Sequence, residues 1–485
     1  MTDKPRSGGG DHAQAATRPK EYDAIFVGAS LTSLAAAAAL AAKGKAVLFW
    51  VGADIDPTPS SFRFAEGPLL YFGFEEGGVM EGFFSEIRYP IPNLKHERFL
   101  FKRTAPFLQV VQPNHRVDLY PQREETLGEL KRDFAQKGKI DPFFEEIEKE
   151  AAVLYPFLGR FPQTEVQGFA DRIGAWRQRA QFQAVVRNHQ KKSAIEFLAP
   201  FNFDDQFLAF LNLQSLFAFQ KPLADISAYD LILLESGFIR GGVRMIGGVS
   251  TLVSFFLKRI TASGGRVVQD KEIARIEAGE KRAHEIFFAD ETHVLGKHLI
   301  VVEPQASSLL QFYFTIRREV IPTPMRESLL MTWGKEIPRD VIDFLLVRLN
   351  LSEEGDSQEK GSQDGLRALA VTVFFRPGIE VAEDRVEEVR AKVLERLGWL
   401  IPFSGSHLQE VGRKAEKGPF PASLKDQVVA WAKQRQALSD EIGGLYRPKG
   451  NKSVTLLSND LSTALGWGTS FLAAITLART VQEGR

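Results

Sequence analysis

The chain has 485 residues, which is too long for one ordinary hydrophobic core, and a typical size of about 150 residues per domain predicts two or three domains. Lysine plus arginine equals aspartate plus glutamate, at 61 each, so no net charge attracts nucleic acid. The absence of cysteine excludes disulfides, thiolate metal ligands, iron–sulfur clusters and a thiol nucleophile, and it is compatible with a cytoplasmic location.

The first 20 residues mix glycine, proline and charged side chains without an apolar run, which predicts a disordered tail rather than a signal peptide. The strongest uninterrupted apolar run, Leu34 to Ala42, has about half the length that a membrane-spanning helix requires. We therefore expect no transmembrane segment. Contact with a membrane surface, self-association and a paralogous partner subunit stay open.

Residues 22–51 carry the pattern of a βαβ unit. The run YDAIFV (22–27) predicts a strand that ends at Gly28, the alanine-rich run 34–42 predicts a helix, and AVLFWV (46–51) predicts a second buried strand. A right-handed crossover places the first turn of such a helix at the carboxyl end of the first strand. Free amide hydrogens at that turn form the place where a dinucleotide binds.

The rest of the chain alternates between helical and strand patterns. A largely helical region covers 124–236, and glycine pairs bound an amphipathic helix at 249–263. Two alternating runs flank a polar loop at 352–365, which we interpret as a solvated connector. Strands are predicted at 266–269, 273–277, 283–289, 298–302, 341–351, 366–375 and 454–457, and a last helix at 468–482.

Phenylalanine is unusually frequent, with 38 residues against 8 tyrosines. Seven of them fall within one short stretch, at Phe197, Phe201, Phe203, Phe207, Phe210, Phe217 and Phe219. Because phenylalanine has no polar group, such a cluster builds either a dry core, which we favour, or the wall of a site for an apolar ligand. A membrane-surface patch is disfavoured because Asp204 and Asp205 interrupt the stretch.

Four segments in order resemble the FAD-dependent amine oxidase and phytoene desaturase family: 22–50, 62–84, 240–277 and 456–480. The resemblance implies an α/β fold in which a discontinuous Rossmann-like FAD-binding domain carries an inserted α+β substrate domain. The FAD-type domain would comprise 21–75, 240–305 and 445–485, and the substrate domain 76–239 and 306–444.

The phosphate-binding fingerprint G-x-G-x-x-G needs its glycines for a tight turn, for approach of the pyrophosphate and for close packing of helix on strand. Here the six positions read Gly28, Ala29, Ser30, Leu31, Thr32 and Ser33, so only the first glycine is kept. Val51 stands where the family has a ribose-binding carboxylate, and this loss costs ~1.5 to 3 kcal/mol. We expect weakened binding, because the helix still offers its first amides and the serines and threonine suit a helix cap.

Other positions follow from the resemblance alone. Ile273 matches a strand position that contacts adenine, and Asp460 lies near the ribityl-pyrophosphate end, unless it is a simple turn or helix-cap aspartate. Gly466 and Gly468 lie where a glycine turn begins the last helix, with its first turn toward the flavin.

No residue is assigned a catalytic role from the sequence. The eight histidines lack the spacing of a zinc site, and neither a G-x-S-x-G elbow nor a P-loop is present, which disfavours metal, hydrolase and ATPase chemistry. Arg240 and Arg244 could bind a carboxylate or phosphate, or be ordinary surface or ion-pair arginines.

Two functions remain. The first is an FAD-linked oxidoreductase that acts on an apolar or isoprenoid-like substrate, since the flavin takes the hydride and few ionisable residues are needed. The second is a cofactor-depleted pseudoenzyme that serves as a binding or partner subunit, or as a carrier of lipid-like molecules. NAD(P) in place of FAD is disfavoured because Val51 cannot accept a hydrogen bond from ribose.

Overall fold

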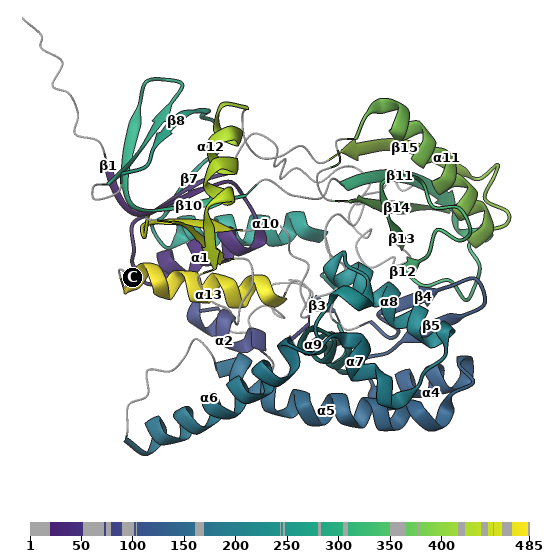
Figure 1. Cartoon of the computed structure of the whole chain (residues 1–485). Coiled ribbons are helices and arrows are strands. Elements are labelled where there is room, and N and C mark those ends of the chain that lie inside the picture. The colour runs from purple at the N-terminus through teal and green to yellow at the C-terminus, as the bar shows by residue number, and fades with distance from the viewer. Residues whose placement is uncertain are drawn as a thin grey trace, which may run out of the picture.

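The computed structural model shows two β-sheets and a block of helices (Figure 1). It describes residues 20–51, 72–73, 79–89, 101–102, 104–160, 169–242, 244–245, 248–279, 283–303, 309–349, 365–376, 379, 381–415, 422–437, 445–449, 451–457 and 468–483. Apart from Lys20 and Gly365, the predicted tail and the polar loop lie outside these ranges.

The larger sheet has nine strands and a parallel centre in the order β18, β10, β1, β2, β7. β2, β18 and the second halves of β1 and β10 are apolar runs, as expected for strands that are covered on both faces. β16 and β17 extend one edge, and β8 and β9 continue from β10. The bounds are β1 Lys20–Val27, β2 Val47–Trp50, β7 Arg266–Val268, β8 Ile273–Glu277, β9 His284–Phe288, β10 His293–Val302, β16 Arg435–Ala437, β17 Leu445–Pro448 and β18 Val454–Leu457.

Helices cover one face of this sheet. α1 is buried along its length from Leu31 to Ala41, and it packs against α10 and α13, with α2 beside α13 (Figure 1). Its alanine side chains allow this close packing, since they fill little space and lose little entropy in a helix. The opposite face carries β8, β9 and α12. The bounds are α1 Leu31–Ala42, α2 Val79–Glu86, α10 Gly248–Ala262, α12 Ala422–Lys433 and α13 Gly468–Gln482.

The second sheet has seven strands in the order β15, β11, β14, β13, β12, β4, β5 and is antiparallel except for the pairing of β4 with β12. The long helix α11 (Glu383–Leu400) packs its apolar stripe on one face. The bounds are β4 Leu108–Val111, β5 Arg116–Leu119, β11 Leu309–Arg317, β12 Ser328–Met331, β13 Val341–Leu349, β14 Leu366–Phe375 and β15 Leu408–Ala415.

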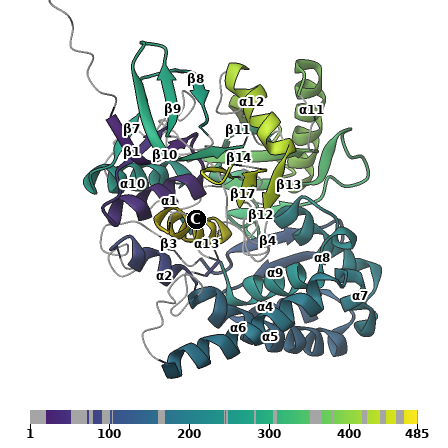
Figure 2. The ribbon, with the colours of Figure 1, turned by 60° about the vertical axis from the view of Figure 1, so that its left-hand side comes forward.

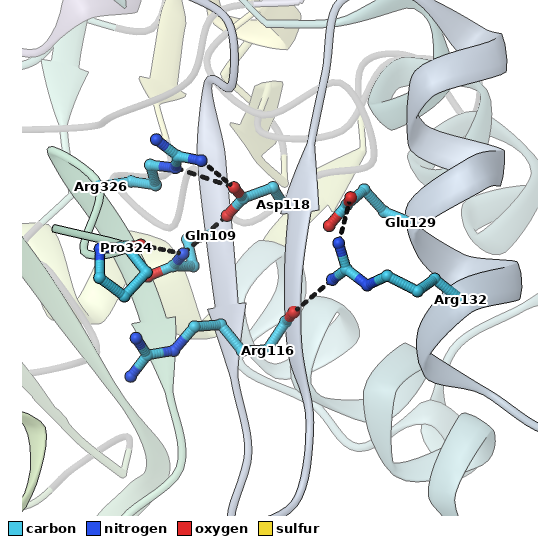
Figure 3. Close-up of polar contacts among 7 residues, drawn as sticks. All are labelled: Gln109, Arg116, Asp118, Glu129, Arg132, Pro324 and Arg326. Atoms are coloured by element: carbon cyan, nitrogen blue, oxygen red, sulfur yellow. Dashed lines mark hydrogen bonds and ion pairs between the residues drawn. The ribbon is translucent and has the colours of Figure 1, made fainter.

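A polar network joins β4 and β5 to the segment that precedes β12 (Figure 3). Gln109 Nε2 donates to Asp118 Oδ1 at 2.7 Å and to the carbonyl of Pro324 at 2.9 Å. Arg326 Nε donates to the other carboxylate oxygen of Asp118 at 2.8 Å. Because Gln109 and Asp118 are buried, these bonds fix the β4–β5 hairpin against the segment that enters β12.

A block of helices lies against the other face of the seven-stranded sheet and below the nine-stranded sheet (Figure 2). Its core is continuous with the core under α1. The strands β3 (Phe101–Lys102) and β6 (Arg244–Met245) form a short ribbon where the chain returns to the larger sheet. The helices are α4 Arg123–Asp133, α5 Lys137–Arg160, α6 Phe169–Gln190, α7 Ala194–Leu198, α8 Asp205–Phe219 and α9 Ala228–Arg240.

The α/β class expected from the sequence is confirmed. Three elements have the bounds that the sequence predicted: the strands at 273–277 and 454–457 and the helix at 468–482. β10 begins at His293, five residues before the expected start at His298, because its first half pairs with β1 on one side and with the hairpin strand β9 on the other, and alternates between more and less buried residues. None of the described helices is long and apolar enough to cross a membrane.

Candidate dinucleotide site

The chain turns from β1 into α1 at the carboxyl edge of the parallel sheet. Gly28 has a φ of 91°, a left-handed conformation that favours glycine, and its N–H donates to the carbonyl of Trp50 at 3.1 Å. β1 lies between β10 and β2, so this turn is at the centre of the edge. The first glycine of the fingerprint thus keeps its role in the tight turn.

Ser30 and Ser33 replace the other two glycines by bonding to each other. The N–H of Ser30 donates to Ser33 Oγ at 2.8 Å, and the N–H of Ser33 donates to Ser30 Oγ at 3.1 Å. Ser33 is fully buried, and its Oγ lies 2.9 Å from the carbonyl oxygen of Ser30 and 3.2 Å from that of Gly28. The hydroxyl therefore fits between helix and strand, where the third glycine of the fingerprint would make close contact.

This reciprocal cap leaves the first two amides of α1 available. The N–H groups of Leu31 and Thr32 have no hydrogen-bond partner within the described part of the chain. An α-helix begins with N–H groups that have no partner inside the helix, and its dipole places partial positive charge there. The turn accordingly retains two backbone donors suited to a diphosphate.

The next strand end does not fit a ribose. Val51 follows β2 at the same edge, is buried in the apolar core under α1, and donates its N–H to the carbonyl of Val268 at 3.0 Å. Its side chain has no acceptor for the ribose hydroxyls. An FAD molecule would therefore be held at its diphosphate and would lack the usual carboxylate contact.

Two further polar side chains lie at this edge, and neither was expected from the sequence. Glu303 follows β10 directly, and because Val301 of β10 pairs with Val27 of β1, it lies at the same edge of the sheet as the turn at Gly28. Glu303 is only 5% exposed. Ser470, in the first turn of α13, is fully buried, and its Oγ has no hydrogen-bond partner among the residues that the structure describes. The signal for Glu303 was an acid directly after a buried strand.

The first turns of α13 and α1 lie at the same end of the helix layer. Lys43, at the end of α1, donates to Gln482, at the end of α13, at 3.3 Å, so the final turns of the two packed helices meet and their first turns also share one end. Gly468 is the first residue of α13. Asp460 and Gly466 lie outside the described residues.

Ile273 is the first residue of β8, close to the end of β2. Trp50 Nε1 donates to the carbonyl of Lys271 at 2.6 Å, which places the start of β8 beside the end of β2. The Ile273 side chain is buried in the core between the sheet and the β8–β9 hairpin. Only its backbone could contact an adenine ring.

The phenylalanine-rich stretch forms a core. The rings of Phe203 and Phe207 have centroids 4.4 Å apart, and Phe143 meets Phe201, Phe203 and Phe207 edge-on. Phe207 is fully buried. Rings that satisfy each other in this way fill space instead of lining an open ligand site.

Two ionisable side chains of α9, Arg240 and Glu235, lie in the helical block. Arg240 stacks on the ring of Tyr155, with 4.1 Å between its guanidinium carbon and the ring centre. This cation–π contact already engages the guanidinium that was considered for binding a carboxylate or phosphate. Arg244 lies in β6. Glu235 in α9 is 1% exposed, and its Oε1 has no hydrogen-bond partner within the described ranges. Burial raises the pKa of this carboxyl to about 8, so it is largely uncharged at neutral pH.

The fold resembles that of several solved structures. An oxidoreductase from Methanosarcina mazei is 13% identical over 91% of this chain and 98% of its own, with a TM-score of 0.52. Putrescine oxidase bound to putrescine is 14% identical over 96% and 98%, with a TM-score of 0.51. RAB GDI from Plasmodium falciparum is 12% identical over 84% and 92%, with a TM-score of 0.51. At such identity the likeness shows a shared fold alone, an α/β fold with a Rossmann-like domain.

No protein family and no curated protein matches the sequence. The part of the chain that the structure describes also contains no group of His, Asp and Glu residues that could hold a metal ion.

Proposed function

We propose that the protein is an FAD-linked oxidoreductase that holds its cofactor loosely. The carrying observation is the pair of free amides at Leu31 and Thr32, at the carboxyl edge of the central strand of a fold shared with oxidoreductases. These amides would bind the diphosphate, and the Ser30–Ser33 cap would hold them in place. The discontinuous FAD-type domain and the inserted substrate domain proposed from the sequence would follow the two sheets.

When bound, FAD supplies the acceptor for a hydride, so the protein itself need only position the substrate and exclude water. We propose an apolar or isoprenoid-like substrate, which the resemblance implies, and the apolar interior shared by the helical block and the seven-stranded sheet would border its site. The carboxyl of Glu235, uncharged at neutral pH, adds a hydrogen-bonding group to that interior without adding charge.

The test is an absorbance spectrum of the purified protein, followed by titration with FAD. Flavin bands that appear with the protein, or a saturable change in flavin fluorescence on titration, are the expected result. Protein that stays colourless and gives no saturable change at excess FAD would overturn the proposal.

A second candidate is a cofactor-free binding or partner subunit with the same fold. It is favoured by the burial of the turn, where Ser30 to Ser33 are between 0% and 8% exposed, and by the acid at Glu303. A carboxylate beside a diphosphate site opposes a second negative charge in a region of low dielectric. Stoichiometric flavin in the purified protein would exclude this candidate.

A further inference from the structure

An open depression of about 410 Å³ lies at the far end of the helix layer from the dinucleotide edge, within the volume range of small-ligand sites. It is lined by the last turns of α1 and α10 and by the residue that follows α2. Lys43, Arg88, Arg259 and Ser263 are its polar lining. The lining of the depression therefore carries three positive charges.

Arg88 holds an unusual backbone conformation. The N–H of Arg88 donates to the carbonyl of Ser85 at 3.0 Å, and that of Tyr89 donates to the carbonyl of Phe84 at 2.8 Å. This pattern ends a helix with a residue in the left-handed region, which is usually glycine. Arg88 occupies it with a φ of 56°, at a cost that glycine would avoid. Its side chain is exposed and has no partner among the described residues.

The neighbouring cations are already engaged. Lys43 Nζ lies 2.6 Å from Glu86 Oε2, and Arg479 Nη2 lies 3.3 Å from Glu86 Oε1. Arg259 Nη2 donates to the carbonyl of Ile87 at 3.0 Å, and the guanidinium carbon of Arg259 lies 5.2 Å from the centre of the Tyr89 ring. Among the described residues, Arg88 is therefore the one cation of the lining that has no bonded partner, while Arg259 lines the depression with N–H groups beyond the one that Ile87 accepts.

The charge balance favours an anion. The last turns of α1, α2, α10 and α13 meet here, and helix ends of this kind carry roughly half a negative charge each. Together with Glu86 they offset about three of the four positive charges of Lys43, Arg88, Arg259 and Arg479. An excess of about one positive charge remains. We assign it to Arg88, because the other three cations already contact neighbouring groups.

We propose that this depression binds a phosphate group, with Arg88 and Arg259 as charged donors and the Ser263 hydroxyl as a third donor. The chemistry is that of a phosphate monoester, carried either by a soluble metabolite or by a lipid head group. The site is separate from the turn at Gly28, so it does not depend on whether the protein binds FAD.

Calorimetric titration of the whole protein with inorganic phosphate, at constant ionic strength set with chloride, tests the site. Arg88→Gly is the decisive variant because glycine suits the left-handed position, so the variant should unfold at a higher temperature than the wild type. Its phosphate affinity should fall about tenfold or more, the effect of losing one charge-assisted hydrogen bond. Lys258→Gln, an exposed neighbour on α10 outside the depression, is the matched control and should bind as the wild type does.

Absence of saturable binding to the wild type, or equal affinity in Arg88→Gly, would overturn the proposal. Vesicles of phosphatidylcholine with and without phosphatidic acid then distinguish the source of the phosphate. Co-sedimentation that requires phosphatidic acid and is lost in Arg88→Gly assigns a lipid head group. Binding of free phosphate without co-sedimentation assigns a soluble ligand.

Discussion

Ser30 and Ser33 bond to each other at both of their main-chain N–H groups, with N to Oγ distances of 2.8 and 3.1 Å. The pair stands where a phosphate-binding turn has its second and third glycines. Because each hydroxyl accepts from the other residue's amide, the turn is held by side chains instead of by close backbone contact. The stability of the turn should therefore depend on these hydroxyls.

Ser33→Ala should lower the free energy of unfolding by about 1 to 2 kcal/mol, because it leaves the buried N–H of Ser30 without an acceptor and removes half of the helix cap. Urea denaturation measures the change. Thr261→Ala, which removes an exposed hydroxyl bonded within α10, is the control and should stay within about 0.5 kcal/mol of the wild type. Equal midpoints for Ser33→Ala and the wild type would contradict the assigned role.

Val51→Glu should tighten FAD binding, since it restores a carboxylate at the end of β2, where the ribose would lie. The expected fall in the dissociation constant is roughly 10- to 150-fold. Val51→Gln, with similar size and no charge, should gain less. Without FAD the glutamate variant should be less stable than the wild type, because Val51 lies in the apolar core. Unchanged FAD affinity in both variants would count against a ribose near Val51.

The sequence predicted the centre of the larger sheet well because buried parallel strands are short apolar runs bounded by glycine and polar turns. It did not predict β4, β5 or β12, since β4 pairs with β12 across a separation of more than 200 residues and no local pattern encodes such a pairing. It also missed α11, whose apolar stripe of Val386, Val389 and Val393 packs on the second sheet.

The sequence did not predict that Glu235 and Glu303 are buried, and the reason is different. All residues of α9 from Leu231 to Ile239 are buried, so this part of the helix has no polar face against which the inward position of Glu235 could be recognised. Glu303 similarly follows a strand that is buried on both faces. Periodicity locates an element, but it does not tell where one charged side chain points when every face is covered.

Glu235 should make stability depend on pH. Its pKa is raised from 4.5 to about 8 by burial, so the folded protein binds a proton that the unfolded chain releases between these values. The contribution to stability is complete below pH 4.5 and is lost as the pH rises through 8, at up to ~1.4 kcal/mol per pH unit. Glu235→Gln and Glu235→Leu should lose this dependence. Denaturation between pH 5 and pH 8 measures it, and parallel profiles for wild type and variants would contradict the assignment.

Phe207→Ala tests whether the phenylalanine-rich stretch is a packed core or the wall of a ligand site. Phe207 is fully buried and contacts the rings of Phe134, Phe143, Phe203 and Phe210, so truncation should open a cavity that the surrounding rings cannot fill. We expect a loss of about 3 to 5 kcal/mol in the free energy of unfolding, measured by urea denaturation. Phe403→Ala is the matched control, because this ring is 76% exposed and its removal should change stability by less than about 0.5 kcal/mol. If Phe207 instead lined an open site, its truncation would enlarge a space that already exists, and the two variants would unfold at similar urea concentrations.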